Sequence, residues 1–106
     1  MSEECTLEFG PGGQARLGGP LTFKTSTRLF HCMEKQLQSG KTVTQIDLSE
    51  VSTADSAGLA LLLEWQANSK LSGHKMTMTG APESLLQLAK LCESIEILGL
   101  SGRDSA

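Results

Sequence analysis

The chain has few of the features that build disulfide-bonded, zinc-binding or membrane-spanning proteins. It contains three cysteines, Cys5, Cys32 and Cys92, and none belongs to a C-x-x-C pair. An odd number of widely spaced cysteines indicates reduced thiols rather than a disulfide framework or a zinc site. The longest uninterrupted apolar run, residues 57–63, is about a third of the length that a membrane-spanning helix requires. We therefore expect a cytoplasmic protein without direct membrane insertion.

Basic residues are also too few for a protein that binds nucleic acid. Nine Lys and Arg residues stand against twelve Asp and Glu residues, which gives a formal net charge of -3 at pH 7. Phosphate backbones bind to surfaces with an excess of positive charge, so the balance argues against a nucleic-acid partner. The acidic start, Met1-Ser2-Glu3-Glu4, is not followed by an apolar stretch. We therefore expect no secretory signal.

What is present fits one small globular domain. The 106 residues fill a single compact unit, and the proportions of 39% hydrophobic and 20% charged residues are typical of such a domain. We expect one domain over residues 1–106, with a core from about residue 4 to residue 98 and a frayed polar tail over residues 101–106. A core of this size leaves little volume for a deep substrate cavity.

Hydrophobic periodicity predicts strands and helices that alternate. Phe23, Phe30, Met33 and Leu37 recur at helical spacing, and Ser39-Gly40 ends that helix. The other helices are expected over residues 56–72 and from Pro82 to about residue 91. Strands are expected at residues 6–9, 15–17, 42–48, 75–79 and 95–98. This order predicts an α/β fold: a mixed central sheet of about five strands with right-handed crossovers, its faces covered by three or four helices.

The second predicted helix begins with residues that suit two different roles. Asp55 or Ser56 occupies the N-cap region, where backbone N–H groups lack partners and the helix dipole is positive. A side-chain oxygen there can cap the helix, and the same position would stabilise a phosphate on Ser56. Gly58 would let another backbone approach the first turn. Asp55 and Gly58 are therefore predicted to support the helix N-terminus, and Ser56 is a possible phosphorylation site.

This helix is apolar on two faces, although a helix that lies on a sheet needs only one. The second face begins at Ser56 and is either covered by the neighbouring helix or left as a contact surface for another protein. Trp65 is the only tryptophan of the chain, and tryptophan is enriched at the centres of interfaces. We therefore favour a partner-binding surface on this face. It is predicted to comprise Ser56, Ala57, Ala60, Leu61, Glu64 and Trp65.

No combination of residues predicts catalysis. A Ser-His-Asp arrangement would need His31 or His74 beside Ser56, but His31 lies in the first helix and His74 follows the far end of the second, roughly 25 Å away at about 1.5 Å per residue. Neither histidine has a partner at metal-ligand spacing. We expect no enzymatic activity, no catalytic residue, no bound metal and no cofactor.

Two motifs resemble STAS domains, the family of sulfate transporters and anti-sigma factor antagonists. They are Ile46-Asp47-Leu48-Ser49-x-Val51 and, closely after it, Asp55-Ser56-Ala57-Gly58-Leu59-Ala60-Leu61-Leu62. The likeness extends from about residue 4 to residue 98. In the anti-sigma factor antagonists the first serine of a D-S-S-G-like stretch is phosphorylated by a partner kinase. That branch would make Ser56 the phosphoacceptor, although Ala57 replaces the second serine.

A second branch, the MlaB-type STAS subunits of phospholipid ABC transporters, is the one we favour. Leu59-Ala60-Leu61-Leu62-Leu63-Glu64-Trp65 is closer to its pattern. The resemblance implies a non-enzymatic subunit with Ser56 at its contact with the transporter ATPase, and through the ATPase a permease and a lipid-binding subunit. It would act at the inner face of the inner membrane and maintain outer-membrane lipid asymmetry. A module with a structural role only is a third alternative, which a buried Trp65 would favour.

Overall fold

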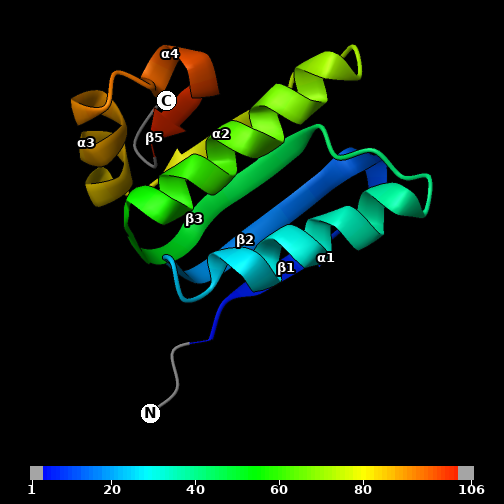
Figure 1. Ribbon diagram of the computed structural model, residues 1–106, viewed down its shortest axis with the longest axis horizontal. Coiled ribbons are helices and arrows are strands. Elements are labelled where there is room, and N and C mark those ends of the chain that lie inside the picture. Colours follow the sequence, from blue (N-terminus) through cyan, green and yellow to red (C-terminus); the bar gives the residue numbers. More distant parts are fainter. Residues whose placement is uncertain (1–3, 103–106) are drawn as a thin grey trace.

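Five strands and four α-helices alternate along the computed structural model, which describes residues 4–102 (Figure 1). The strands are β1 (Thr6–Phe9), β2 (Gln14–Leu21), β3 (Gln45–Ala54), β4 (Thr77–Ala81) and β5 (Leu100–Gly102). The helices are α1 (Ser26–Gln38), α2 (Ser56–Leu71), α3 (Glu83–Leu91) and α4 (Ile95–Leu98), with a short 3-10 turn η1 (Pro11–Gly13) between β1 and β2. This confirms the predicted α/β fold.

The strands form one mixed sheet in the order β1-β2-β3-β4-β5. β1 is antiparallel to β2, and the other neighbours are parallel. Each parallel pair is joined by a helical crossover, so α1 and α2 run in the same direction and begin at the same end of the sheet (Figure 1). Their N-terminal ends therefore lie together, as do their C-terminal ends.

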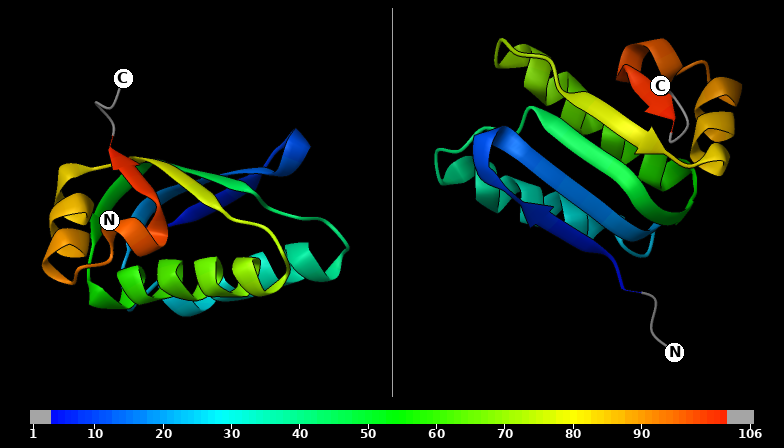
Figure 2. Two further views of the ribbon diagram at one scale, coloured as in Figure 1. Left: turned by 90° about the horizontal axis from the view of Figure 1, so that it is seen from above. Right: turned by 180° about the vertical axis from the view of Figure 1, so that it is seen from behind.

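Helices α1 and α2 lie side by side on one face of the sheet, while α3 and α4 pack around its β4–β5 side (Figure 2). Among residues 4–102 no helix covers the opposite face, so the expectation that helices cover both faces is wrong (Figure 2). The reason is visible in the strand sequences: Gln14 and Arg16 alternate with the buried Ala15 and Leu17. A strand with one polar face needs only one covered side.

The core lies between the sheet and the helices, and Gln66 on α2 is the most deeply buried of the four buried polar residues among residues 4–102. Its amide nitrogen donates to the Met76 carbonyl at 2.6 Å and to the Leu98 carbonyl at 2.9 Å. Its amide oxygen accepts from the Met76 N–H at 2.9 Å. Gln66 thus ties α2 to the segment that enters β4 and to the end of α4. A buried amide is tolerated because these partners satisfy it.

The C-terminal segment differs from the prediction. Residues 95–98, expected as an edge strand, form the short helix α4, and the edge strand β5 follows at Leu100–Gly102. Gly99 separates the two: its φ of 64° is left-handed, which ends the helix and turns the chain into the strand. Ser101 and Gly102, expected in the frayed tail, belong to β5, and the rest of that tail, 103–106, lies outside the described residues. No helix over residues 4–102 is long and apolar enough to cross a membrane.

Candidate functional site

The N-terminal ends of α1 and α2 form a shallow open groove on the outer side of the helix layer, with a volume of about 340 Å³. Its lining comes from both helices and consists of Ser26, Thr27, Phe30, Ala57, Ala60, Leu61 and Glu64. We call this groove, together with Ser56 and Phe23 at its end of the helix pair, the N-terminal surface. It contains most of the residues that the sequence predicts for partner binding.

Asp55 fixes the geometry of this surface with its two carboxylate oxygens. Oδ1 accepts from the Gly58 N–H at 3.0 Å and so caps α2. Oδ2 accepts from the Phe23 N–H at 3.1 Å, which ties the β2–α1 turn to the start of α2. The Asp55 N–H itself donates to the Leu21 carbonyl at 3.1 Å. One side chain therefore holds together the two segments that carry Phe23 and Ser56.

Gly58 brings the first turn of α2 against the end of β2. A Cβ atom at this position would collide with the backbone carbonyl of Leu21. The close approach is therefore between two segments of the same chain, and only a residue without a side chain permits it. Together with the Asp55 cap, this contact makes the start of α2 a rigid part of the fold.

Ser56 is the first residue of α2, and its side chain is exposed. Backbone N–H groups at a helix N-terminus favour an anion or a hydrogen-bond acceptor. Ala57 is partly buried, and Ala60 and Glu64 are exposed one and two turns further along. These four residues form a continuous strip with small side chains at one end and a carboxylate at the other.

Two members of the predicted partner-binding surface do not face outward. Trp65 is 3% exposed and Leu61 is 7% exposed, and both belong to the core. The expectation that they present an apolar surface to another protein is therefore wrong. The physical reason is the neighbouring helix: α1 lies beside α2 (Figure 1), and its side chains pack next to Leu61 and Trp65 while the rest of that face stays open. Leu61 reaches only the floor of the groove.

The exposed aromatic residue of this surface is Phe23, which sequence reasoning placed on the apolar stripe of the first helix. The helix begins only at Ser26, so Phe23 lies in the preceding turn and is 66% exposed. The Thr25 hydroxyl accepts from the Thr22 N–H at 3.0 Å and donates to the Pro20 carbonyl at 2.8 Å, which holds this turn. The sequence predicts Ser26 or Thr25 as the cap of this helix, and the structure places Thr25 at the N-cap.

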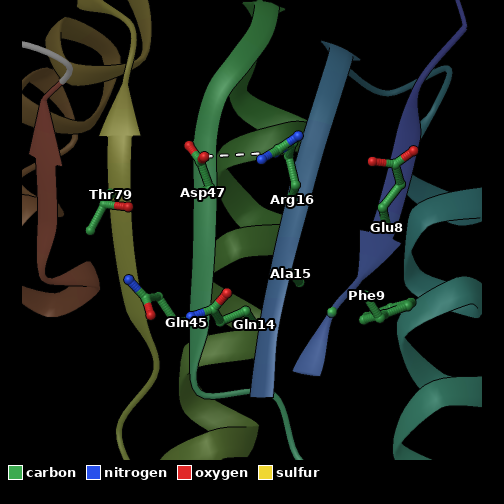
Figure 3. A pocket seen from close by; sticks show the side chains of 9 residues that line it. Glu8, Phe9, Gln14, Ala15, Arg16, Gln45, Asp47 and Thr79 are labelled. Carbon is green, nitrogen blue, oxygen red and sulfur yellow. Dashed lines mark ion pairs between the residues drawn. The ribbon is translucent and has the colours of Figure 1, made fainter. Parts of the chain in front are cut away.

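The open face of the sheet has a second hollow of about 420 Å³, lined mostly by polar residues of β1, β2, β3 and β4 (Figure 3). Arg16 and Asp47 form an ion pair across it at 3.8 Å, while Phe9 points away towards α1 (Figure 3). The Ser49 N–H donates to the Asp47 carboxylate at 2.9 Å. Hydrogen bonds from Ser49, helped by Arg16, hold the pKa of Asp47 below its ordinary value. This is the geometry of a solvated sheet face.

Neither histidine lines the groove at the start of the two helices. His31 lies on α1 with its Nδ1 atom 3.9 Å from the Glu34 carboxylate, and His74 lies in the turn after the C-terminal end of α2. Within residues 4–102, no three His, Cys, Asp or Glu side chains are grouped so that they could hold a metal ion. The N-terminal surface offers a shallow contact area and a hydroxyl group at a helix start.

Both the fold and the sequence place the chain among STAS domains. It belongs to the family described as Mlab, STAS domain, whose model matches residues 11–101. Within that family it is similar to the intermembrane phospholipid transport system binding protein MlaB of Escherichia coli (strain K12) and to that of Shigella flexneri. Each is 41% identical over 63 residues, which are 59% of this chain and 65% of the relative. The match thus spans slightly less than two thirds of these relatives.

Solved structures show the same fold at low sequence identity. The anti-sigma factor antagonist SpoIIAA in its unphosphorylated form aligns with a TM-score of 0.71 at 14% identity, covering 95% of this chain and 90% of SpoIIAA. A putative anti-sigma factor antagonist from Thermotoga maritima aligns with a TM-score of 0.76 at 15% identity, covering 92% of this chain and 85% of that one. These similarities establish the architecture.

Proposed function

We propose that this chain is a non-enzymatic STAS subunit that binds and supports the ATPase of a phospholipid ABC transporter. Through the ATPase it joins a permease and a lipid-binding subunit at the cytoplasmic face of the inner membrane, in a system that maintains outer-membrane lipid asymmetry. The N-terminal surface is the contact in this proposal. ATP and phospholipid are then handled by the partners, and this chain supplies binding energy and a fixed shape.

The observation that carries the proposal is the exposure of Phe23 beside the rigid start of α2. Phe23 is 66% exposed, and its apolar surface is removed from water only when a partner covers it. Asp55 holds the Phe23 backbone and the α2 N-terminus together, so little ordering is needed when a partner binds. The sequence relationship to MlaB supports the transporter ATPase as that partner.

The N-terminal surface also argues against the alternative that this chain is a purely structural module. The burial of Trp65 would favour that alternative, because it removes the tryptophan from the outside of the domain. The groove between the two helix starts remains, however, and Phe23 supplies an aromatic anchor in place of the indole. Aromatic side chains are frequent centres of interfaces.

The second candidate function is an anti-sigma factor antagonist whose binding is switched by phosphorylation of Ser56 by an anti-sigma factor kinase. The observation that favours it is the exposure of Ser56 at the first position of α2. A phosphate there would be stabilised by the helix N-terminus and would add about -1.5 to -2 charges to the contact. Mass spectrometry after incubation with such a kinase distinguishes the two: an unmodified Ser56 rules this candidate out.

The first function is tested by copurification of the transporter ATPase with this chain. Two variants of the chain are compared, each with one arginine substitution in α2. Ala60→Arg places a long charged side chain in the groove, whereas Ala67→Arg places the same side chain at an exposed position of α2, two turns further on. We expect Ala60→Arg to abolish copurification and Ala67→Arg to preserve it, with both variants folded by circular dichroism. Copurification that survives Ala60→Arg would contradict the proposal.

A further inference from the structure

Another cavity, separate from the N-terminal groove and from the hollow on the open sheet face, lies between α1 and α2 at the opposite end of the helix pair. It has a volume of about 370 Å³, within the size range of pockets that hold small molecules. Its apolar lining comes from α1, α2 and the two loops that lead into β3 and β4, and consists of Met33, Leu37, Val43, Trp65 and Met76. An adjoining groove shares Met33, Leu37 and Trp65 and extends outward to Leu71, which is 86% exposed.

Two buried polar atoms belong to the residues that line this cavity. The Trp65 Nε1 atom and the Ser69 Oγ atom are closed to solvent, and neither has a hydrogen-bond partner among the described residues. An indole N–H only donates, and a hydroxyl group both donates and accepts, so each of the two can pair with an acceptor atom. Leaving such groups unpaired is costly in a folded protein. A ligand that brings an acceptor between the helices would remove this cost.

The polar residues at the mouth of the cavity add a preference for negative charge. Lys41 and His74 line it from the loops after α1 and α2. Helix C-termini carry partial negative charge, which on its own would repel an anion. Lys35 and Lys70, in the last turns of α1 and α2, offset that charge. Lys41 is therefore left to attract an anionic group at the entrance.

We propose that this cavity binds a single alkyl chain with an anionic, hydrogen-bond-accepting head group, such as a fatty-acid carboxylate. The alkyl chain packs against the apolar lining, and a head-group oxygen accepts from Trp65 and Ser69 while Lys41 contributes positive charge. Met33 and Met76 have unbranched side chains that repack easily, which lets the head group reach donors that are otherwise closed off. The proposal is independent of the partner at the N-terminal surface.

Calorimetry and fluorescence with decanoate, below its micelle concentration, test this on the purified full chain. Trp65 is the only tryptophan, so its emission reports directly on the cavity. We expect saturable one-to-one binding with a shift in that emission, and binding to 1-decanol and decyltrimethylammonium at least about tenfold weaker. A charge-assisted hydrogen bond is worth about 1.5–3 kcal/mol, which corresponds to tenfold or more.

Two matched serine substitutions locate the contact. Ser69→Ala removes the buried hydroxyl and should weaken decanoate about tenfold. Ser72→Ala removes an exposed hydroxyl of the same cavity and should change the affinity less than twofold. Trp65→Phe, followed by calorimetry, should weaken binding as Ser69→Ala does, and Ala60→Arg should leave it unchanged.

Three results would overturn the proposal. The first is the absence of saturable decanoate binding in the folded wild-type chain. The second is equal affinity for decanoate and 1-decanol, which would contradict the anionic head group. The third is binding of the chain to vesicles of anionic phospholipid while decanoate fails to bind, which would assign the cavity and the exposed Leu71 to a membrane surface instead.

Discussion

The two ends of the α1–α2 pair are built for different kinds of contact. At the N-terminal end the helices begin with small and polar side chains, and Asp55 and Gly58 lock them onto the end of β2. At the C-terminal end an apolar cavity lies between the same helices, and two of its lining residues carry unpaired buried polar atoms. A rigid, open surface suits a protein partner, whereas a partly enclosed cavity suits a small ligand. One helix pair can therefore serve two separate sites.

Replacement of Gln66 should have the largest effect, because this residue holds the C-terminal half of α2 in place. Gln66→Leu leaves the Met76 N–H and the Met76 and Leu98 carbonyls unpaired inside the core. We expect the free energy of unfolding to fall by about 3 kcal/mol, measured by urea denaturation. Gln87→Leu, on the exposed side of α3, is the control and should change it by less than about 0.5 kcal/mol. A Gln66→Leu variant as stable as wild type would contradict this role.

The next effect is expected at the N-terminal end. Gly58→Ala forces the first turn of α2 away from the Leu21 carbonyl, because a new Cβ atom has no room there. We expect a loss of about 2 kcal/mol in the free energy of unfolding, together with weaker partner binding. Decanoate binding at the other end should be nearly unchanged in the folded protein. If both sites lost affinity equally, the two ends would not be independent.

Removal of the Asp55 cap should cost less stability but disturb the N-terminal surface specifically. Asp55→Ala loses the acceptor of both the Gly58 and the Phe23 N–H groups. We expect about 1–2 kcal/mol of destabilisation and faster hydrogen exchange at the Phe23 amide. Ser56→Ala is the matched control, since its exposed hydroxyl should contribute little to stability. Unchanged exchange at Phe23 would show that another contact holds the turn.

The smallest effect is expected on the open sheet face, away from both ends. The pKa of Asp47 is lowered in the folded state, mainly by hydrogen bonds from Ser49. The carboxylate therefore stabilises the fold above its unfolded pKa, near 3.8, and this contribution disappears as the pH falls through the lowered value. Asp47→Asn should flatten the acid limb of the stability profile only slightly, because the side chain is 40% exposed. A large change at neutral pH would contradict this account.

Periodicity and motifs predicted much of the fold and part of the site. The D-S-A-G segment placed the start of α2 correctly, because capping and close packing are decided by residues next to each other in the chain. The sequence left open whether Trp65 is buried, since its burial depends on where α1 lies relative to α2. The helix at residues 95–98 was also missed, because a four-residue apolar segment fits a strand equally well.

The central claim is that the N-terminal surface binds the transporter ATPase with Phe23 as its anchor. The most direct measurement is the affinity of the purified chain for that ATPase, compared between Phe23→Ala and Leu91→Ala. Both positions carry exposed apolar side chains, but Leu91 lies at the end of α3, outside the surface. The account predicts a loss of about thirtyfold for Phe23→Ala, typical of an interface anchor, and less than twofold for Leu91→Ala. Equal affinities for wild type and Phe23→Ala would contradict it.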